Sequence, residues 1–170
     1  QRWIAAYGEP TARAIAADTC RADPANQAEY DAILQNFVAS LKPVDDKVAA
    51  LRAKYKGVPV TATEPVFGYM SDAIGLDMRN QRFQLATMND TEASAQDVAA
   101  FEGDLRKKRV RALIYNSQAE EPMTKRMLKI ARDGGVPTVS VPKARPPAKT
   151  YRKWMTRKLA APGAALPAKK

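Results

Sequence analysis

Four short polar segments follow the candidate strands of this chain and contain the residues best suited to binding a ligand. They are residues 63–65, 88–92, 116–118 and 142–145. In folds that alternate strands and helices around a parallel sheet, ligands bind beyond the carboxyl ends of the strands. We therefore expect the functional site within these four segments.

The candidate ligand-binding residues are one carboxylate, two amides and two cations, namely Glu64, Asn116, Gln118, Lys143 and Arg145. Glu64 could hold a hard cation, or it could cap a helix that begins at Val66, because negative charge is favourable at a helix N-terminus. The two amides could orient a polar solute or could satisfy the backbone of a helix-entry turn. Lys143 and Arg145 could pair with Glu64 across a crevice, bind a carboxylate or phosphate, or remain in solvent.

A further pair of carboxylates, Asp90 and Glu92, occupies the second segment. These side chains could supply oxygen ligands to a hard cation. The more common role for carboxylates in this position is to cap the helix that opens at Ser94.

The composition excludes most catalytic chemistry. The 170 residues include no histidine and one cysteine, Cys20. This excludes a Ser-His-Asp triad, a Cys-His pair, a histidine base and histidine-ligated zinc, as well as an internal disulfide and a tetrahedral thiolate site. The chain also has no Gly-rich phosphate loop and no nucleophile-elbow motif. We predict that the protein is not an enzyme.

The charge is strongly basic, with a formal net value of +10 that concentrates in the C-terminal half. Such a charge attracts nucleic acid, but no recognised nucleic-acid motif accompanies it, so we expect no nucleic-acid partner. No segment approaches the ~20 apolar residues of a membrane helix, so we expect no membrane-spanning segment. No signal-like apolar run is present, so any secretory signal is expected to have been removed or to lie outside these residues.

Hydrophobic periodicity predicts a helical arm followed by an α/β lobe. Helices are expected over 11–21, 26–41 and 44–56, with Pro43 as a kink or a restart between the last two. After Gly57, β-branched runs bounded by Gly and Pro alternate with helical patterns. The expected strands are 58–63, 83–87, 110–115 and 137–141, and the expected helices between and after them are 67–74, 94–105, 121–132 and 150–159.

This alternation predicts a Rossmann-like three-layer α/β/α lobe with a mostly parallel four-stranded sheet, preceded by a long linker helix. The expected organisation is a helical arm over residues 1–56, the α/β lobe over 57–160 and a flexible tail over 161–170. The tail is expected because its composition is of low complexity.

Several motifs, in the correct order and spacing, resemble the solute-binding proteins of zinc- and manganese-family ABC transporters. The first is the run Asp23-Pro24-Ala25-Asn26 with Tyr30, which is similar to the opening of the family's linker helix. The others are residues 60–69 (VTATEPVFGY) with Gly75-Leu76, residues 91–94 (TEAS), and Thr150-Tyr151 with Met155. The resemblance covers roughly residues 18–159.

The resemblance implies a periplasmic or extracytoplasmic metal-binding protein that delivers its cargo to the membrane permease of an ABC transporter. In that family a rigid long helix joins two α/β lobes. The chain would then comprise the helix and the C-terminal lobe, with the N-terminal lobe of the same protein as an expected partner. Glu64 falls where the family has its third metal ligand, which is His in zinc-type and Glu in manganese-type members. A carboxylate without imidazole favours manganese, with zinc as the alternative.

The segment 142–145 departs from the family pattern. The family has an Asp or Glu ligand there, whereas this chain has Lys143 and Arg145. A positive charge within ~5 Å of a metal ion is unfavourable by several kcal/mol at intermediate dielectric. The alternative function is therefore a lobe with a degenerate metal site, acting as an organic-anion-binding or protein-interaction module through these cations and the basic last helix.

Overall fold

The computed structural model describes residues 5–118, 121–142 and 151–166. Its elements, in chain order, are α1 (Ala5–Ala22), the 3-10 turn η1 (Pro24–Asn26), α2 (Gln27–Tyr55), β1 (Pro59–Ala62), α3 (Gly68–Ile74), β2 (Asp77–Arg79), α4 (Gln81–Met88), α5 (Ala95–Arg106), β3 (Leu113–Tyr115), α6 (Pro122–Asp133), β4 (Thr138–Ser140) and α7 (Tyr151–Ala165).

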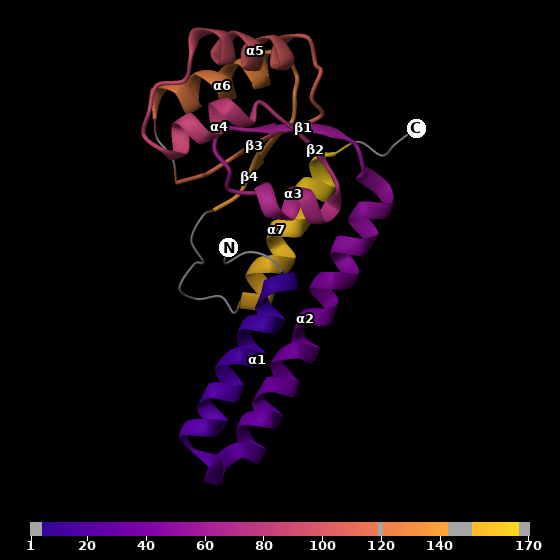
Figure 1. Ribbon diagram of the computed structural model, residues 1–170. Coiled ribbons are helices and arrows are strands. Elements are labelled where there is room, and N and C mark those ends of the chain that lie inside the picture. Colours follow the sequence, from indigo (N-terminus) through magenta and orange to yellow (C-terminus); the bar gives the residue numbers. More distant parts are fainter. Residues whose placement is uncertain (1–4, 119–120, 143–150, 167–170) are drawn as a thin grey trace.

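Helices α1 and α2 form a hairpin that extends away from the α/β lobe (Figure 1). At its corner the Asp23 carboxylate accepts hydrogen bonds of 2.8 Å from Asn26 Nδ2 and from the Tyr30 hydroxyl. These bonds lower the pKa of Asp23, because they favour its charged form. The motif that spans Asp23 to Tyr30 therefore builds the corner between the two helices. Helix α2 runs without interruption through Pro43, which excludes the restart that the sequence allowed.

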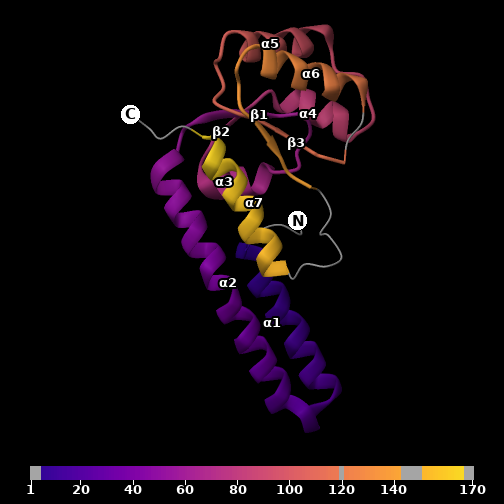
Figure 2. The ribbon, with the colours of Figure 1, turned by 180° about the vertical axis from the view of Figure 1, so that it is seen from behind.

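The four strands are parallel and lie in the order β2-β1-β3-β4. Helices α2, α3 and α7 cover one face of the sheet, and α4, α5 and α6 cover the other (Figure 1, Figure 2). Alternate strand residues enter the two cores: Ala62 and its register partner Ile114 pack toward the first group of helices, and Leu113 packs toward the second. The predicted three-layer α/β/α fold with a parallel four-stranded sheet is confirmed.

The strand predicted at 83–87 is wrong, because these residues belong to helix α4. In a strand Phe83, Leu85 and Thr87 would share one face, whereas here Phe83 is buried and Leu85 is 48% exposed. Phe83 packs edge-on against Phe101 of α5, with ring centroids 4.7 Å apart. Tertiary packing of one aromatic residue thus overrides the β-propensity of this segment.

The second strand is instead β2, which sequence reasoning missed. It lies at the edge of the sheet and has one apolar residue, Met78, between Asp77 and Arg79. An edge strand of three residues needs no continuous apolar run, so it leaves little hydrophobic signal. The other three predicted strands are confirmed with shorter bounds.

The flexible tail predicted from residue 161 is wrong for residues 161–166. Helix α7 continues to Ala165, and Leu166 is buried in the core shared with α2. The Tyr55 hydroxyl of α2 donates a hydrogen bond of 3.2 Å to the carbonyl of Gly163. Contacts with α2 therefore order this segment. The boundary drawn at residue 57 stays a prediction, and α2 contributes Val44 and Leu51 to the same core.

Among the residues that the structure describes, no helix is both long enough and apolar enough to cross a membrane.

Candidate functional site

The carboxyl ends of β1 and β3 form the topological switch point of the sheet. From β1 the chain continues to β2 on one side, and it later returns to β3 on the other side of β1. Connections that leave two adjacent strands in opposite directions open a crevice, and ligands in parallel α/β folds bind there. The segments that follow these two strands begin at Thr63 and Asn116, so two of the four predicted segments meet at this edge.

Glu64 lies directly at the switch point and is 8% exposed. The backbone N–H of Thr63 donates to the carbonyl of Ile114 at 3.1 Å. The pairing of β1 with β3 therefore extends to Thr63, the residue before Glu64. The N–H of Val66 donates to the carbonyl of Glu64 at 2.8 Å and closes a tight turn at Pro65. The carboxylate is therefore attached to backbone that the sheet and the turn hold in place.

The helix-capping alternative for Glu64 is not what the structure contains. Helix α3 begins at Gly68, its N-cap position is Phe67, and the Phe67 side chain makes no capping hydrogen bond. Glu64 is therefore four positions from the first helical residue, beyond the reach of an N-cap interaction.

Asn116 follows β3 and is 7% exposed. Ala62 of β1 pairs with Ile114 of β3, and extending this register by two residues places position 116 opposite Glu64. The Asn116 Oδ1 atom accepts a hydrogen bond of 3.0 Å from the backbone N–H of Gln118. This is the turn that satisfies its own backbone, one of the two alternatives expected from the sequence. Gln118 itself is exposed.

Asp90 and Glu92 do not follow a strand end, because the residues expected as the strand before them form helix α4. Both residues are exposed. Ser94 caps α5 through a hydrogen bond of 3.1 Å from the Asp97 N–H. The expectation that Asp90 and Glu92 occupy a loop after the second strand is therefore wrong.

The true end of the second strand carries a polar network that sequence reasoning missed. The side-chain amide of Asn80 donates to the Thr61 hydroxyl at 3.2 Å and to the buried Asp104 carboxylate at 3.1 Å. Arg79 Nε lies 2.9 Å from the same carboxylate. These polar groups pair with one another, which indicates that the network positions β2 and α4 rather than a ligand.

Lys143 and Arg145 lie outside the described residues, so their pairing with Glu64 stays a prediction. Within the described ranges, no group of three or more His, Cys, Asp or Glu side chains is arranged to hold a metal ion. Glu64 supplies one carboxylate of the kind that a hard cation binds, but the described residues at the switch point do not supply a complete set of ligands.

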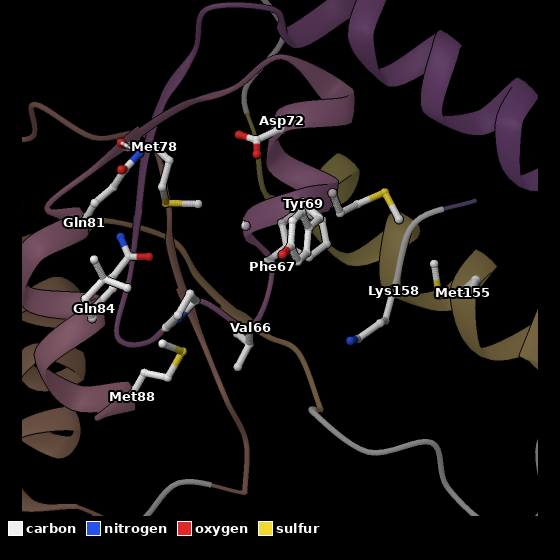
Figure 3. Close-up of a pocket in the computed structure, with 14 residues that line it drawn as sticks. Val66, Phe67, Tyr69, Asp72, Met78, Gln81, Gln84, Met88, Met155 and Lys158 are labelled. Carbon is white, nitrogen blue, oxygen red and sulfur yellow. Dashed lines mark hydrogen bonds between the residues drawn. The ribbon is translucent and has the colours of Figure 1, made fainter. Parts of the chain in front are cut away.

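Beside the switch point, a pocket of about 480 Å³ lies between α3, α4 and α7 (Figure 3). The Lys158 side chain of α7 reaches toward Val66 across this pocket and is 6% exposed. Its ammonium nitrogen lies 4.8 Å from the centre of the Trp154 ring. Burial lowers the pKa of Lys158 to about 8. The sequence marks the last helix as basic, but which of its cations turns inward depends on how the helix packs.

A family model described as zinc-uptake complex component A, periplasmic, matches residues 5–161 of the chain. No curated protein matches the chain in sequence.

Solved structures of similar fold include a zinc-binding protein and a protein in complex with Mn²⁺. A crystal structure of ZnuA has a TM-score of 0.69 and 18% identity, over 96% of this chain and 59% of that one. The periplasmic zinc-binding protein TroA from Treponema pallidum has a TM-score of 0.66 and 20% identity, over 90% and 58% of the chains. The SBP FpvC from Pseudomonas aeruginosa, solved in complex with Mn²⁺, has a TM-score of 0.65 and 18% identity, over 89% and 55%. The chain thus spans 55–59% of the length of these three proteins.

Proposed function

Because the chain belongs to the family of periplasmic zinc-uptake complex component A, we propose that it forms one side of a divalent-metal site in an extracytoplasmic solute-binding protein. Such a protein captures an ion and delivers it to the permease of an ABC transporter. The proposal involves no enzymatic step, and the family match favours it over the alternative of an interaction module with a degenerate site.

The observation that carries this proposal is the buried carboxylate of Glu64 at the switch point between β1 and β3. A metal ligand must be held in a fixed position by the groups around it. The bond from the Thr63 N–H to β3 and the turn at Pro65 provide this support for Glu64. The carboxylate is the residue through which this lobe would contact the ion.

The chemistry of Glu64 favours a hard ion such as Mn²⁺. Carboxylate oxygen suits manganese, whereas zinc is most often bound by imidazole or thiolate. The chain has no histidine, and its single cysteine, Cys20, lies in α1 of the hairpin. Zn²⁺ is the second candidate, because carboxylates also bind it.

One carboxylate is too few for tight binding, since manganese prefers an oxygen shell of about six. We propose that the other ligands come from a second lobe, corresponding to the part of the related proteins that this chain does not match. Without metal, Lys143 or Arg145 would take the place of the ion beside Glu64. Metal binding would then displace this cation.

The test is a calorimetric titration of the complete protein with Mn²⁺ and with Zn²⁺. E64Q keeps the size of the side chain and removes its charge, and E92Q is the matched control at an exposed carboxylate. We expect E64Q to weaken Mn²⁺ binding at least tenfold and E92Q to leave it unchanged.

Two results would overturn the proposal. One is metal binding that E64Q does not alter. The other is the absence of heat from either ion at micromolar concentration when thermal melting shows that the protein is folded.

A further inference from the structure

The pocket between α3, α4 and α7 has the size and lining of a small-molecule site. Its volume of about 480 Å³ lies within the roughly 300–1,000 Å³ of ligand pockets. Most of its wall is apolar, and four of the six methionines of the chain contribute to it: Met70, Met78, Met88 and Met155. Flexible thioether side chains adapt to apolar ligands of different shapes.

Lys158 is the exception in this apolar wall. A lysine that is 6% exposed costs free energy, because its ammonium loses most of its hydration. Contact with the Trp154 ring at 4.8 Å is one of the interactions that offset this cost. Figure 3 shows the side chain leaving α7 and extending across the pocket toward Val66, opposite Met78 and Met88.

We propose that this pocket binds an amphipathic organic anion, with the anionic group at the Lys158 ammonium and the hydrocarbon part against Phe67, Met78 and Met88. The site uses none of the residues assigned to the metal, so the inference does not depend on the proposed metal function. The protein would then carry two separate sites on the same edge of the sheet.

Charge selects this class of ligand over the others. The charged side chains of the described pocket wall are Lys158 and Asp72, and Asp72 is exposed on α3. An anion that reaches the buried ammonium gains a strong interaction, because few water molecules screen it there. A neutral apolar compound would fill the same volume without this contribution.

Octanoate and octanol are matched probes, since they share a chain length and differ in charge. The chain has two tryptophans, so Trp3→Phe leaves Trp154, which lies close to Lys158, as the single tryptophan, and excitation at about 295 nm avoids the tyrosines. We expect octanoate to change the Trp154 fluorescence in a saturable manner and to bind about tenfold more tightly than octanol.

Three variants in this background test the role of Lys158. K158M keeps the hydrocarbon stem and removes the charge, and we expect it to bring octanoate binding down to the level of octanol. K153M removes an exposed lysine of the same helix and should change nothing. M88E places a negative charge at the exposed rim and should weaken octanoate binding even if K158M fails to fold.

Equal binding of octanoate and octanol, or octanoate binding unaffected by K158M and M88E, would overturn the proposal. Either result would show that the charge of Lys158 does not determine what the pocket binds. Measurements in the presence of a chelator keep the outcome separate from any metal binding at Glu64.

Discussion

The Tyr30 hydroxyl donates a hydrogen bond of 2.8 Å to the Asp23 carboxylate, seven residues earlier in the chain. This bond ties the first turn of α2 to the corner at which the chain leaves α1. It gives a structural reason for the spacing of aspartate and tyrosine in the motif that marks the start of the long helix.

We expect Y30F to raise the pKa of Asp23 toward its ordinary value of 3.8, because one of the two side-chain bonds that favour the carboxylate is lost. The folded-state pKa of Asp23 lies below the unfolded value, so its stabilisation is present above about pH 3.8 and is lost as the pH falls through the folded pKa. NMR titration of the Asp23 carboxyl measures the shift. D31A, at an exposed aspartate of α2, is the control, and an unchanged Asp23 titration in Y30F would contradict the assignment.

Phe83 and Leu85 should respond oppositely to truncation. F83A removes a ring that is 2% exposed and packed edge-on against Phe101, and it should cost about 3–5 kcal/mol of unfolding free energy. L85A removes a side chain that is 48% exposed and should cost less than about 1 kcal/mol. Urea denaturation measures both. Similar losses would contradict the helical register of α4.

Gly75 and Gly103 form a second matched pair. Gly75 ends α3 with a φ of +79°, and an added Cβ would lie 3.2 Å from Lys56 Cγ. G75A should therefore destabilise the protein by about 1–2 kcal/mol. Gly103 lies inside α5, and apart from its chain neighbours and the nearby backbone of its own helix no atom lies within 4 Å of an added Cβ. G103A should therefore stabilise the protein by about 0.5–1 kcal/mol. Thermal unfolding distinguishes the two signs, and a stabilising G75A would contradict the left-handed conformation.

Lys158 should make stability depend on alkaline pH. Its pKa falls from 10.5 to about 8 on burial, so between these values the unfolded chain binds more protons than the folded chain. The contribution of Lys158 to the free energy of unfolding therefore rises with pH across that window, by on the order of 2 kcal/mol. Below pH 8 the cost of the buried charge is fully present. The other charged side chain of the described pocket wall is Asp72.

The measurement is urea denaturation of the unmodified chain, K158M and K153M at pH 7 and pH 10. The unmodified chain should gain stability relative to K158M between the two values, because methionine does not titrate. A constant difference between these two proteins would show that the lysine stays charged, and K153M should behave as the unmodified chain does.

The local sequence was sufficient to predict the helical arm, three of the strands and the fold class. These features are local, because they are formed by residues that are close together in the chain. They include the corner motif at Asp23 and the runs with β-branched residues at 58–63, 110–115 and 137–141. Glu64 could be selected in the same way, since a carboxylate directly after a buried strand lies at the ligand-binding edge of a parallel sheet.

Tertiary structure alone decided the strand order, the position of β2 and the burial of Lys158. Strand order determines that the segments at Glu64 and Asn116 meet, and the helical state of α4 means that Asp90 and Glu92 do not follow a strand. The inward orientation of Lys158 depends on the packing of α7 against α2 and the sheet. Both results arise from contacts between residues far apart in the chain, and the periodicity of a single segment contains no information about its distant partners.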